Sequence, residues 1–206
     1  MDQKNYNNTV FLNCPFDDEY RSLRDALVFA IYDCGFVPSC ALGESDGGDI
    51  RFDKIVRLIE SARYGIHDMS RVELSEGNNL PRFNMPLELG LFLGAKRFGD
   101  KEQHKKNALI LESQPYRYQQ FISDISGQDI RCHKGDCNLI ISHVRDWLAT
   151  ASKRILPGGK DISLRYGRFS KELPALCAAA RTSLDELTFN DFGIFVSEWL
   201  TADKPT

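Results

Sequence analysis

Residues 84–95 read NMPLELGLFLGA, a run of apolar residues and glycines that contains a single carboxylate, Glu88. Pro86 suits the first turn of a helix, because the N–H that proline lacks would have no partner there. We therefore expect a packed helix with Asn84 as its N-cap. An acid near a helix N-terminus complements the helix dipole, which alone would explain Glu88. The alternative is that Glu88 is the reactive group of a cleft.

The capping pattern favours the second explanation. With Asn84 as N-cap, the third helical position is Leu87, so Glu88 is not the acid of a capping box and its side chain is left unengaged. A helix N-terminus would also favour the ionised carboxylate, as a nucleophile or an electrostatic partner requires.

The composition limits the class of protein. With 206 residues, 42% of them hydrophobic, the chain is long enough for one α/β domain and a modest extension. The 26 basic and 29 acidic residues form no basic block, so we expect no nucleic-acid partner, while a small anionic ligand stays open. The polar N-terminus and the lack of a run of about 20 apolar residues predict a soluble, cytoplasmic protein without a membrane span.

The six cysteines are scattered, unlike those of a secreted disulfide scaffold, and we expect reduced thiols. They are Cys14, Cys34, Cys40, Cys132, Cys137 and Cys177. Cys132, His133, Cys137 and His143 offer four zinc ligands, but their spacing is loose and no second CxxC pair exists. We therefore favour ordinary thiols and no metal. No Ser/His/Asp or Cys/His grouping can be ordered by spacing either.

Strand and helix patterns alternate along most of the chain. The candidate strands are residues 10–13, 36–42, 63–70, 108–111 and 130–132. The candidate helices between and after them are residues 20–31, 52–59, 84–95 and 138–152. This alternation predicts a doubly wound, mostly parallel sheet covered by helices on both faces. The glycine-rich loop 43–49, with Arg51 after it, suits a phosphate cradle, whereas its three acids and the lack of a known phosphate-binding motif favour a flexible connection.

The C-terminal part is set off by PGGK at residues 157–160. We place an α/β domain at residues 8–156 and a helical extension at residues 161–206, with helices over 170–181 and 184–200. The aromatic residues of the extension are expected to dock on the domain or to form an oligomer contact.

Ligands of doubly wound sheets bind beyond the carboxyl ends of the strands, where the strand order reverses. Segments 13–16, 68–71 and 84–88 all follow candidate strand ends, so we expect them to converge on one cleft. The catalytic candidates are Glu88 and Asp68. The candidate ligand-binding residues are Asn13, Cys14, Pro15, Phe16, Ser70, Asn84 and Met85. Phe16 has an equal alternative as a core aromatic, and His67 should point to the opposite side of its strand from Asp68.

Three of these motifs, VFLNCPF at 10–16, HDMS at 67–70 and PLELG at 86–90, resemble the group that contains TIR-like domains and nucleoside 2-deoxyribosyltransferases. The resemblance implies a flavodoxin-like sheet and a glutamate, matched by Glu88, on which N-glycosidic chemistry depends. It also implies an acid at the end of the third strand, matched by Asp68. Residues 82–85 read RFNM where the deoxyribosyltransferase motif reads Asp-x-Gly-Thr, and the Trp and Cys that TIR enzymes carry just upstream of their glutamate are absent there.

The function that this resemblance implies is cleavage of the N-glycosidic bond of NAD or a related nucleotide, in an immune or stress effector. NAD would then be a substrate, with no separate cofactor. The carboxylate would stabilise the oxocarbenium-like transition state or form a glycosyl intermediate. The alternative is a non-catalytic module of the same fold that senses a nucleotide or acts as an assembly adaptor, joining a second copy or another protein through its C-terminal helices.

Overall fold

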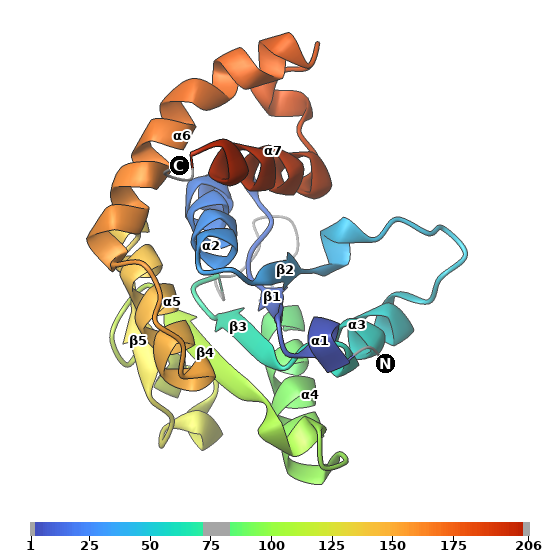
Figure 1. The fold of residues 1–206 in the computed structure, drawn as a ribbon. Helices are drawn as coiled ribbons and strands as arrows, with labels where there is room; N and C mark the ends of the chain where they lie inside the picture. Colours follow the sequence, from blue (N-terminus) through green and yellow to red (C-terminus); the bar gives the residue numbers. More distant parts are fainter. Residues whose placement is uncertain (1–2, 72–82, 204–206) are drawn as a thin grey trace.

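The computed structural model describes residues 3–71 and 83–203, and its centre is an all-parallel sheet of five strands in the order β2-β1-β3-β4-β5 (Figure 1). The strands are β1 (Thr9–Asn13), β2 (Val37–Ser39), β3 (Tyr64–Asp68), β4 (Asn107–Glu112) and β5 (Ile130–Cys132). This is the strand order of flavodoxin-like folds, in which the switch point lies between β1 and β3. The predicted fold class is confirmed.

Helices cover both faces of the sheet. They are α1 (Gln3–Tyr6), α2 (Arg21–Asp33), α3 (Arg51–Glu60), α4 (Asn84–Phe98), α5 (Cys137–Ser152), α6 (Gly159–Ala179) and α7 (Phe189–Ala202). Short 3-10 helices are η1 (Asp18–Tyr20), η2 (Ala41–Gly43), η3 (Gln103–Lys105), η4 (Arg117–Gln120), η5 (Ser123–Ile125) and η6 (Leu184–Glu186). Helices α2 and α5 pack together on one face, while α3 and α4 pack together on the other. No helix in the described ranges is long and apolar enough to cross a bilayer.

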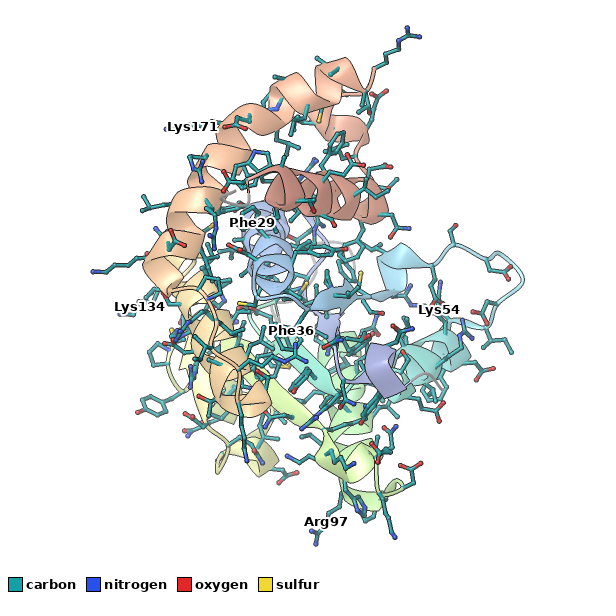
Figure 2. The ribbon with its side chains drawn as sticks, viewed as in Figure 1. Phe29, Phe36, Lys54, Arg97, Lys134 and Lys171 are labelled. Carbon is teal, nitrogen blue, oxygen red and sulfur yellow. The ribbon has the colours of Figure 1, made fainter. Side chains whose placement is uncertain are left out.

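The C-terminal helices form an outer layer over α2. The ring of Phe29 lies 5.4 Å from Phe169 of α6 and 6.0 Å from Trp199 of α7, centroid to centroid. Phe29 and Phe36 point into the interior, whereas Lys134 and Lys171 extend into solvent (Figure 2). Of the two expected roles for the C-terminal aromatics, docking on the α/β part is the one observed. The helices complete the core that α2 begins.

Two boundaries of these helices differ from the prediction. Helix α6 begins at Gly159, inside the predicted break, because Gly158 takes an extended N-cap conformation and Asp161 lies in the first turn. The predicted helix 184–200 is divided, because Thr188 and Asp191 form a capping box that starts α7 anew.

Helix α4 lies close against β3. A Cβ atom on Gly65 would lie 2.7 Å from Cε2 of Phe92, so only glycine admits the Phe92 ring at this height. The N-cap of α4 is Phe83, not Asn84 as predicted, and Asn84 is already helical. Glu88 therefore lies beyond the first turn, where the helix dipole acts weakly.

Candidate functional site

The end of β1 is tied to the start of α4 by Asn13. Its Nδ2 atom donates to the carbonyl oxygen of Met85 across 2.8 Å and lies 3.1 Å from Nδ1 of His67, its partner in the parallel register of β1 and β3. Burial lowers the pKa of His67 to about 3, so the ring is neutral and Nδ1 accepts from Asn13. Of the three segments expected to converge, 13–16 and 84–88 are joined here by the Asn13–Met85 hydrogen bond, while the contact with β3 is made by His67, which lies outside the expected segment 68–71.

His67 and Asp68 point to opposite sides of the sheet, as their alternation along the strand predicts. His67 packs against Phe92 of α4, with ring centroids 4.9 Å apart. Asp68 faces the other way, toward Tyr20 and His133. Because Asp68 faces away from α4, it takes no part in the hydrogen bonds that Asn13 makes with His67 and Met85.

Asp68 is fully buried and its carboxylate accepts from three donors. The Tyr20 hydroxyl lies 2.5 Å from Oδ2, the Ser70 N–H lies 2.8 Å from Oδ1, and Nε2 of His133 lies 3.1 Å from Oδ2. Burial opposes the ionised form, but the hydrogen bonds from His133, Ser70 and Tyr20 hold the pKa of Asp68 below its ordinary value. Asp68 thus joins η1, the end of β3 and the loop before α5.

Ser70, His133 and Asp68 lie together, but they do not form a catalytic triad. The Gly135 N–H donates to Nδ1 of His133 across 3.0 Å, so the hydrogen-bond network assigns the ring proton to Nε2. That same nitrogen faces both Asp68 Oδ2 and the Ser70 hydroxyl, 2.8 Å away. In a triad the base uses one nitrogen for the nucleophile and the other for the acid. Here His133 serves as a structural donor.

Glu112, which the sequence analysis did not single out, ends β4 at the same edge of the sheet. It is buried, and its Oε1 accepts from the Arg117 guanidinium across 2.8 Å and from the Ser113 N–H across 2.7 Å. Arg117 also donates to the carbonyl oxygen of Ser70. The sequence signal that could have identified Glu112 is its position: it is the last residue of β4, just as Asp68 is the last residue of the neighbouring parallel strand β3.

Most of the predicted site residues are enclosed. The buried ones are Asn13, Cys14, Pro15, Asp68, Ser70 and Met85. Phe16 is half-buried and packs against the main core, so the core alternative for this aromatic is the observed contact. Asn84 is exposed and Glu88 is half-buried. The loop expected between the third strand and the Glu88 helix consists mainly of residues 72–82, which lie outside the described residues.

Glu88 is the accessible ionisable group of the predicted set. Among the described residues nothing donates a hydrogen bond to its carboxylate and no ion pair engages it. Burial raises the pKa of Glu88 to about 7, and Arg51 at the start of α3 opposes this rise. The expectation from the helix terminus was a firmly ionised group. Near neutral pH the carboxyl is instead present in both forms.

Two thiols lie between charges of opposite sign at this edge. Burial raises the pKa of Cys14 and of Cys40, Glu88 adds to both rises, and Arg24 of α2 opposes both. Cys14 follows β1 and Cys40 follows β2. Glu88 and Arg24 belong to α4 and α2, which pack on opposite faces of the sheet.

The four residues considered as zinc ligands have other partners. The Cys132 thiol lies 3.0 Å from the carbonyl oxygen of Ser113, His133 contacts Asp68, and Nε2 of His143 lies 3.1 Å from the carbonyl oxygen of Cys132. The Cys137 thiol points at the carbonyl oxygen of Ser22, 3.6 Å away. All six cysteines lie in the described ranges and are free thiols.

The chain was compared with protein-family models, with curated proteins and with solved structures, and none of them matches it. The chemistry of the residues around Glu88 is therefore the basis for a functional proposal.

Proposed function

We propose that this protein cleaves the N-glycosidic bond of NAD or a related nucleotide, with Glu88 as the reactive carboxylate. The observation that carries the proposal is the environment of Glu88: a half-buried carboxyl group, without a hydrogen-bond partner among the described residues, at the carboxyl edge of a sheet with the order 2-1-3-4-5. Burying an unpartnered acid is costly, and such groups concentrate at functional sites.

The raised pKa of Glu88 suits this reaction. As the bond between the sugar and the base breaks, its electron pair leaves with the base and positive charge develops on the anomeric carbon. That charge favours the ionised form of Glu88, so the carboxylate stabilises the transition state more than the ground state. Water then supplies the oxygen that bonds to the anomeric carbon, and a carboxylate with a pKa of about 7 can accept the water proton.

Asp68 has a different part in this proposal. A group that touches the substrate needs an open face, whereas Asp68 is fully buried and holds three donors. We assign Asp68 a positioning role. It fixes Ser70 and Tyr20 at the carboxyl end of β3, and α4, which carries Glu88, is the next helix along the chain. The catalytic role that the resemblance implies for this acid is therefore not part of the proposal.

The test is NAD consumption by the purified protein, with free nucleosides in parallel, for the wild type and for Glu88→Gln. We expect loss of base release in the variant, while Glu198→Gln, an exposed carboxylate of α7, keeps wild-type turnover. If the wild type releases no more base than Glu88→Gln on any substrate, the proposal is wrong. The oligomeric state of the sample is recorded in the same experiment.

A second candidate is a non-catalytic nucleotide sensor or assembly adaptor. The burial of six of the predicted site residues favours the adaptor form of this candidate, because it leaves little open surface for a ligand at the strand ends. In this case NAD should raise the melting temperature while no product forms. Removing the C-terminal helices is a poor test of assembly, since it uncovers Phe29. Leu164→Lys and Ile194→Lys, at side chains that are 71% and 56% exposed, test self-association without opening the core.

A further inference from the structure

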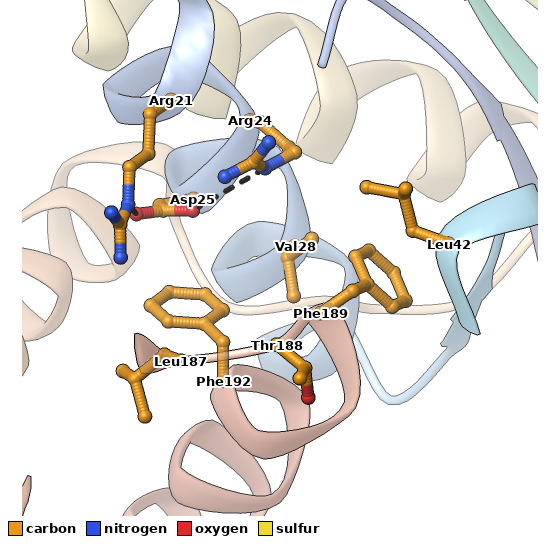
Figure 3. Close-up of a pocket in the computed structure, with 9 residues that line it drawn as sticks. All are labelled: Arg21, Arg24, Asp25, Val28, Leu42, Leu187, Thr188, Phe189 and Phe192. Atoms are coloured by element: carbon orange, nitrogen blue, oxygen red, sulfur yellow. Dashed lines mark ion pairs between the residues drawn. The ribbon is translucent and has the colours of Figure 1, made fainter. Parts of the chain in front are cut away.

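A cavity of about 300 Å³ lies where the first half of α2 faces η2 and the start of α7 (Figure 3). Helix α2 is on the face of the sheet opposite α4, so this cavity is separate from the Glu88 carboxyl. Its walls come from both the α/β part and the C-terminal helices. A volume of this size is at the lower end of the range for small-molecule sites.

One wall of the cavity is positively charged. Arg21 and Arg24 line it together with a single acid, Asp25. The Nε atom of Arg24 is 3.7 Å from Asp25 Oδ1, and the Nε atom of Arg21 is 3.9 Å from Asp25 Oδ2. Both distances are too long for hydrogen bonds. Asp25 therefore balances one of the two charges and saturates the donors of neither guanidinium.

Arg24 is the less satisfied of the two cations. Arg21 donates to the carbonyl oxygen of Leu184 as well as facing Asp25, whereas the described partner of Arg24 is Asp25 alone, and the Arg24 side chain is 16% exposed. A guanidinium has five N–H donors, and among the described residues none of those of Arg24 is both buried and without a partner, so its remaining donors are open to solvent or to the cavity. An anion in the cavity would supply acceptors for them.

Other arginines near the C-terminal helices are paired differently. Arg165 donates to both oxygens of Asp33 at 2.9 Å, and Arg168 donates to both oxygens of Asp203 at 2.8 Å. These bidentate pairs leave little capacity for a ligand. The open donors of Arg24 are thus a property of this cavity and not of the arginines in this region generally.

The opposite wall is apolar. Phe189 of α7 lies toward Val28 and Leu42, while the ring of Phe192 lies nearer to Asp25 in this view (Figure 3). Thr188 also lines it, but its hydroxyl donates to Asp191 and accepts from the Asp191 N–H in the cap of α7. The lining thus offers cationic donors at one end and aromatic and aliphatic surface at the other.

We propose that this cavity binds a small anion with a flat apolar body. Its phosphate or carboxylate group contacts Arg24 and Arg21, and its body packs against Phe189 and Phe192. Because the walls belong to α2 and to α7, the bound molecule holds these two helices together. Binding therefore stabilises the attachment of the C-terminal layer.

Four small probes test the ligand chemistry: phenyl phosphate, benzoate, phenol and inorganic phosphate, each titrated by calorimetry and by thermal shift at pH 8. We expect phenyl phosphate or benzoate to bind at least tenfold tighter than phenol and than inorganic phosphate. The tighter of the two identifies the anionic group. Equal affinity for phenol and for the aromatic anions, or no binding of any probe, overturns the proposal.

Variants of the charged wall test the location. Arg24→Met should weaken binding of the aromatic anion at least tenfold, while Arg168→Met, at a paired arginine of α6, should leave it unchanged. Asp25→Asn should tighten binding about threefold to tenfold, because it removes the competing negative charge. Because Asp25→Asn is expected to tighten binding and Arg24→Met to weaken it, the proposal stays testable if Arg24→Met does not fold. Unchanged or weaker binding by Asp25→Asn contradicts it. None of these readouts depends on the proposed glycosidic activity.

Discussion

The hydroxyl group of Tyr20 donates to Oδ2 of Asp68 across 2.5 Å, and both side chains are buried. Tyr20 ends the short helix before α2, while Asp68 ends β3, so one hydrogen bond joins two segments that are distant in the sequence. With the bonds from Ser70 and His133, it fixes the carboxyl edge of the sheet next to the proposed site.

Asp68→Asn should destabilise the protein by about 2–4 kcal/mol, because it removes a buried charge from three donors. Tyr20→Phe, which removes one donor and leaves no cavity, should cost about 1–2 kcal/mol. Urea unfolding measures both. The folded pKa of Asp68 is lowered, so its stabilising effect is present above its ordinary pKa and is lost as the pH falls through the folded value. Equal stability of Asp68→Asn and wild type at pH 7 would contradict the structural role.

Glu88→Gln should stabilise the protein at neutral pH. Because burial raises the pKa of Glu88 to about 7, the folded state binds more protons than the unfolded state between about pH 4.5 and pH 7. The free energy of unfolding of the wild type therefore falls as the pH rises through this window, whereas that of Glu88→Gln should not, because the variant lacks the titrating carboxyl. We expect a gain of about 1–3 kcal/mol above pH 7 and none below pH 4.5, measured by urea unfolding across pH. Glu198→Gln, at an exposed side chain of α7, is the matched control substitution.

Gly65→Ala should destabilise the protein by about 1–3 kcal/mol, because its Cβ atom would lie 2.7 Å from the Phe92 ring. A second substitution, Phe92→Leu, should recover part of the loss, which a double-mutant cycle detects. Gly90→Ala is the matched control. Its Cβ atom would meet nothing within 4 Å, so the better helix propensity of alanine should stabilise by about 0.5–1 kcal/mol.

Trp199→Ala should cost about 3–5 kcal/mol. It removes ring contacts with Phe29 and Phe169 and the hydrogen bond from Nε1 to Glu172, which is 2.7 Å long. Leu164→Ala, at a side chain exposed on α6, should change stability by less than about 0.5 kcal/mol. Calorimetry should show one transition for the wild type, since α6 and α7 share the core of α2. Two separate transitions would show that the helical layer unfolds independently.

The central sheet was predictable because its strands are short apolar runs closed by polar or proline residues. Strand β4 was expected at 108–111 and spans Asn107–Glu112, while helix α5 was expected at 138–152 and spans Cys137–Ser152. The predicted second strand, 36–42, was too long: it ends at Ser39 and gives way to the 3-10 helix η2. The C-terminal boundaries failed where a local cap, such as Thr188 with Asp191, outweighed the helical periodicity.

The sequence predicted where the candidate site lies, at the carboxyl ends of the strands, better than it predicted which side chains contact each other there. Parallel topology brings the strand ends together, which is why Asn13 and Met85 were named before their hydrogen bond was known. Burial is decided by packing from distant segments, and it encloses Asp68 while leaving Glu88 partly open. His133 and Arg24 carry no local pattern, because their roles depend on partners that the fold supplies.

The packing of Trp199 onto Phe29 also sets the order in which the chain can finish folding. Phe29 is made early on the ribosome and Trp199 near the end of the described chain. At about 5–20 residues per second, many seconds separate the synthesis of these two partners. The sheet and α2 can pack once β5 has been made, but until α6 and α7 follow the outer face of α2 has no cover. The nascent chain therefore exposes an aromatic surface that chaperones can bind until α6 and α7 emerge from the exit tunnel.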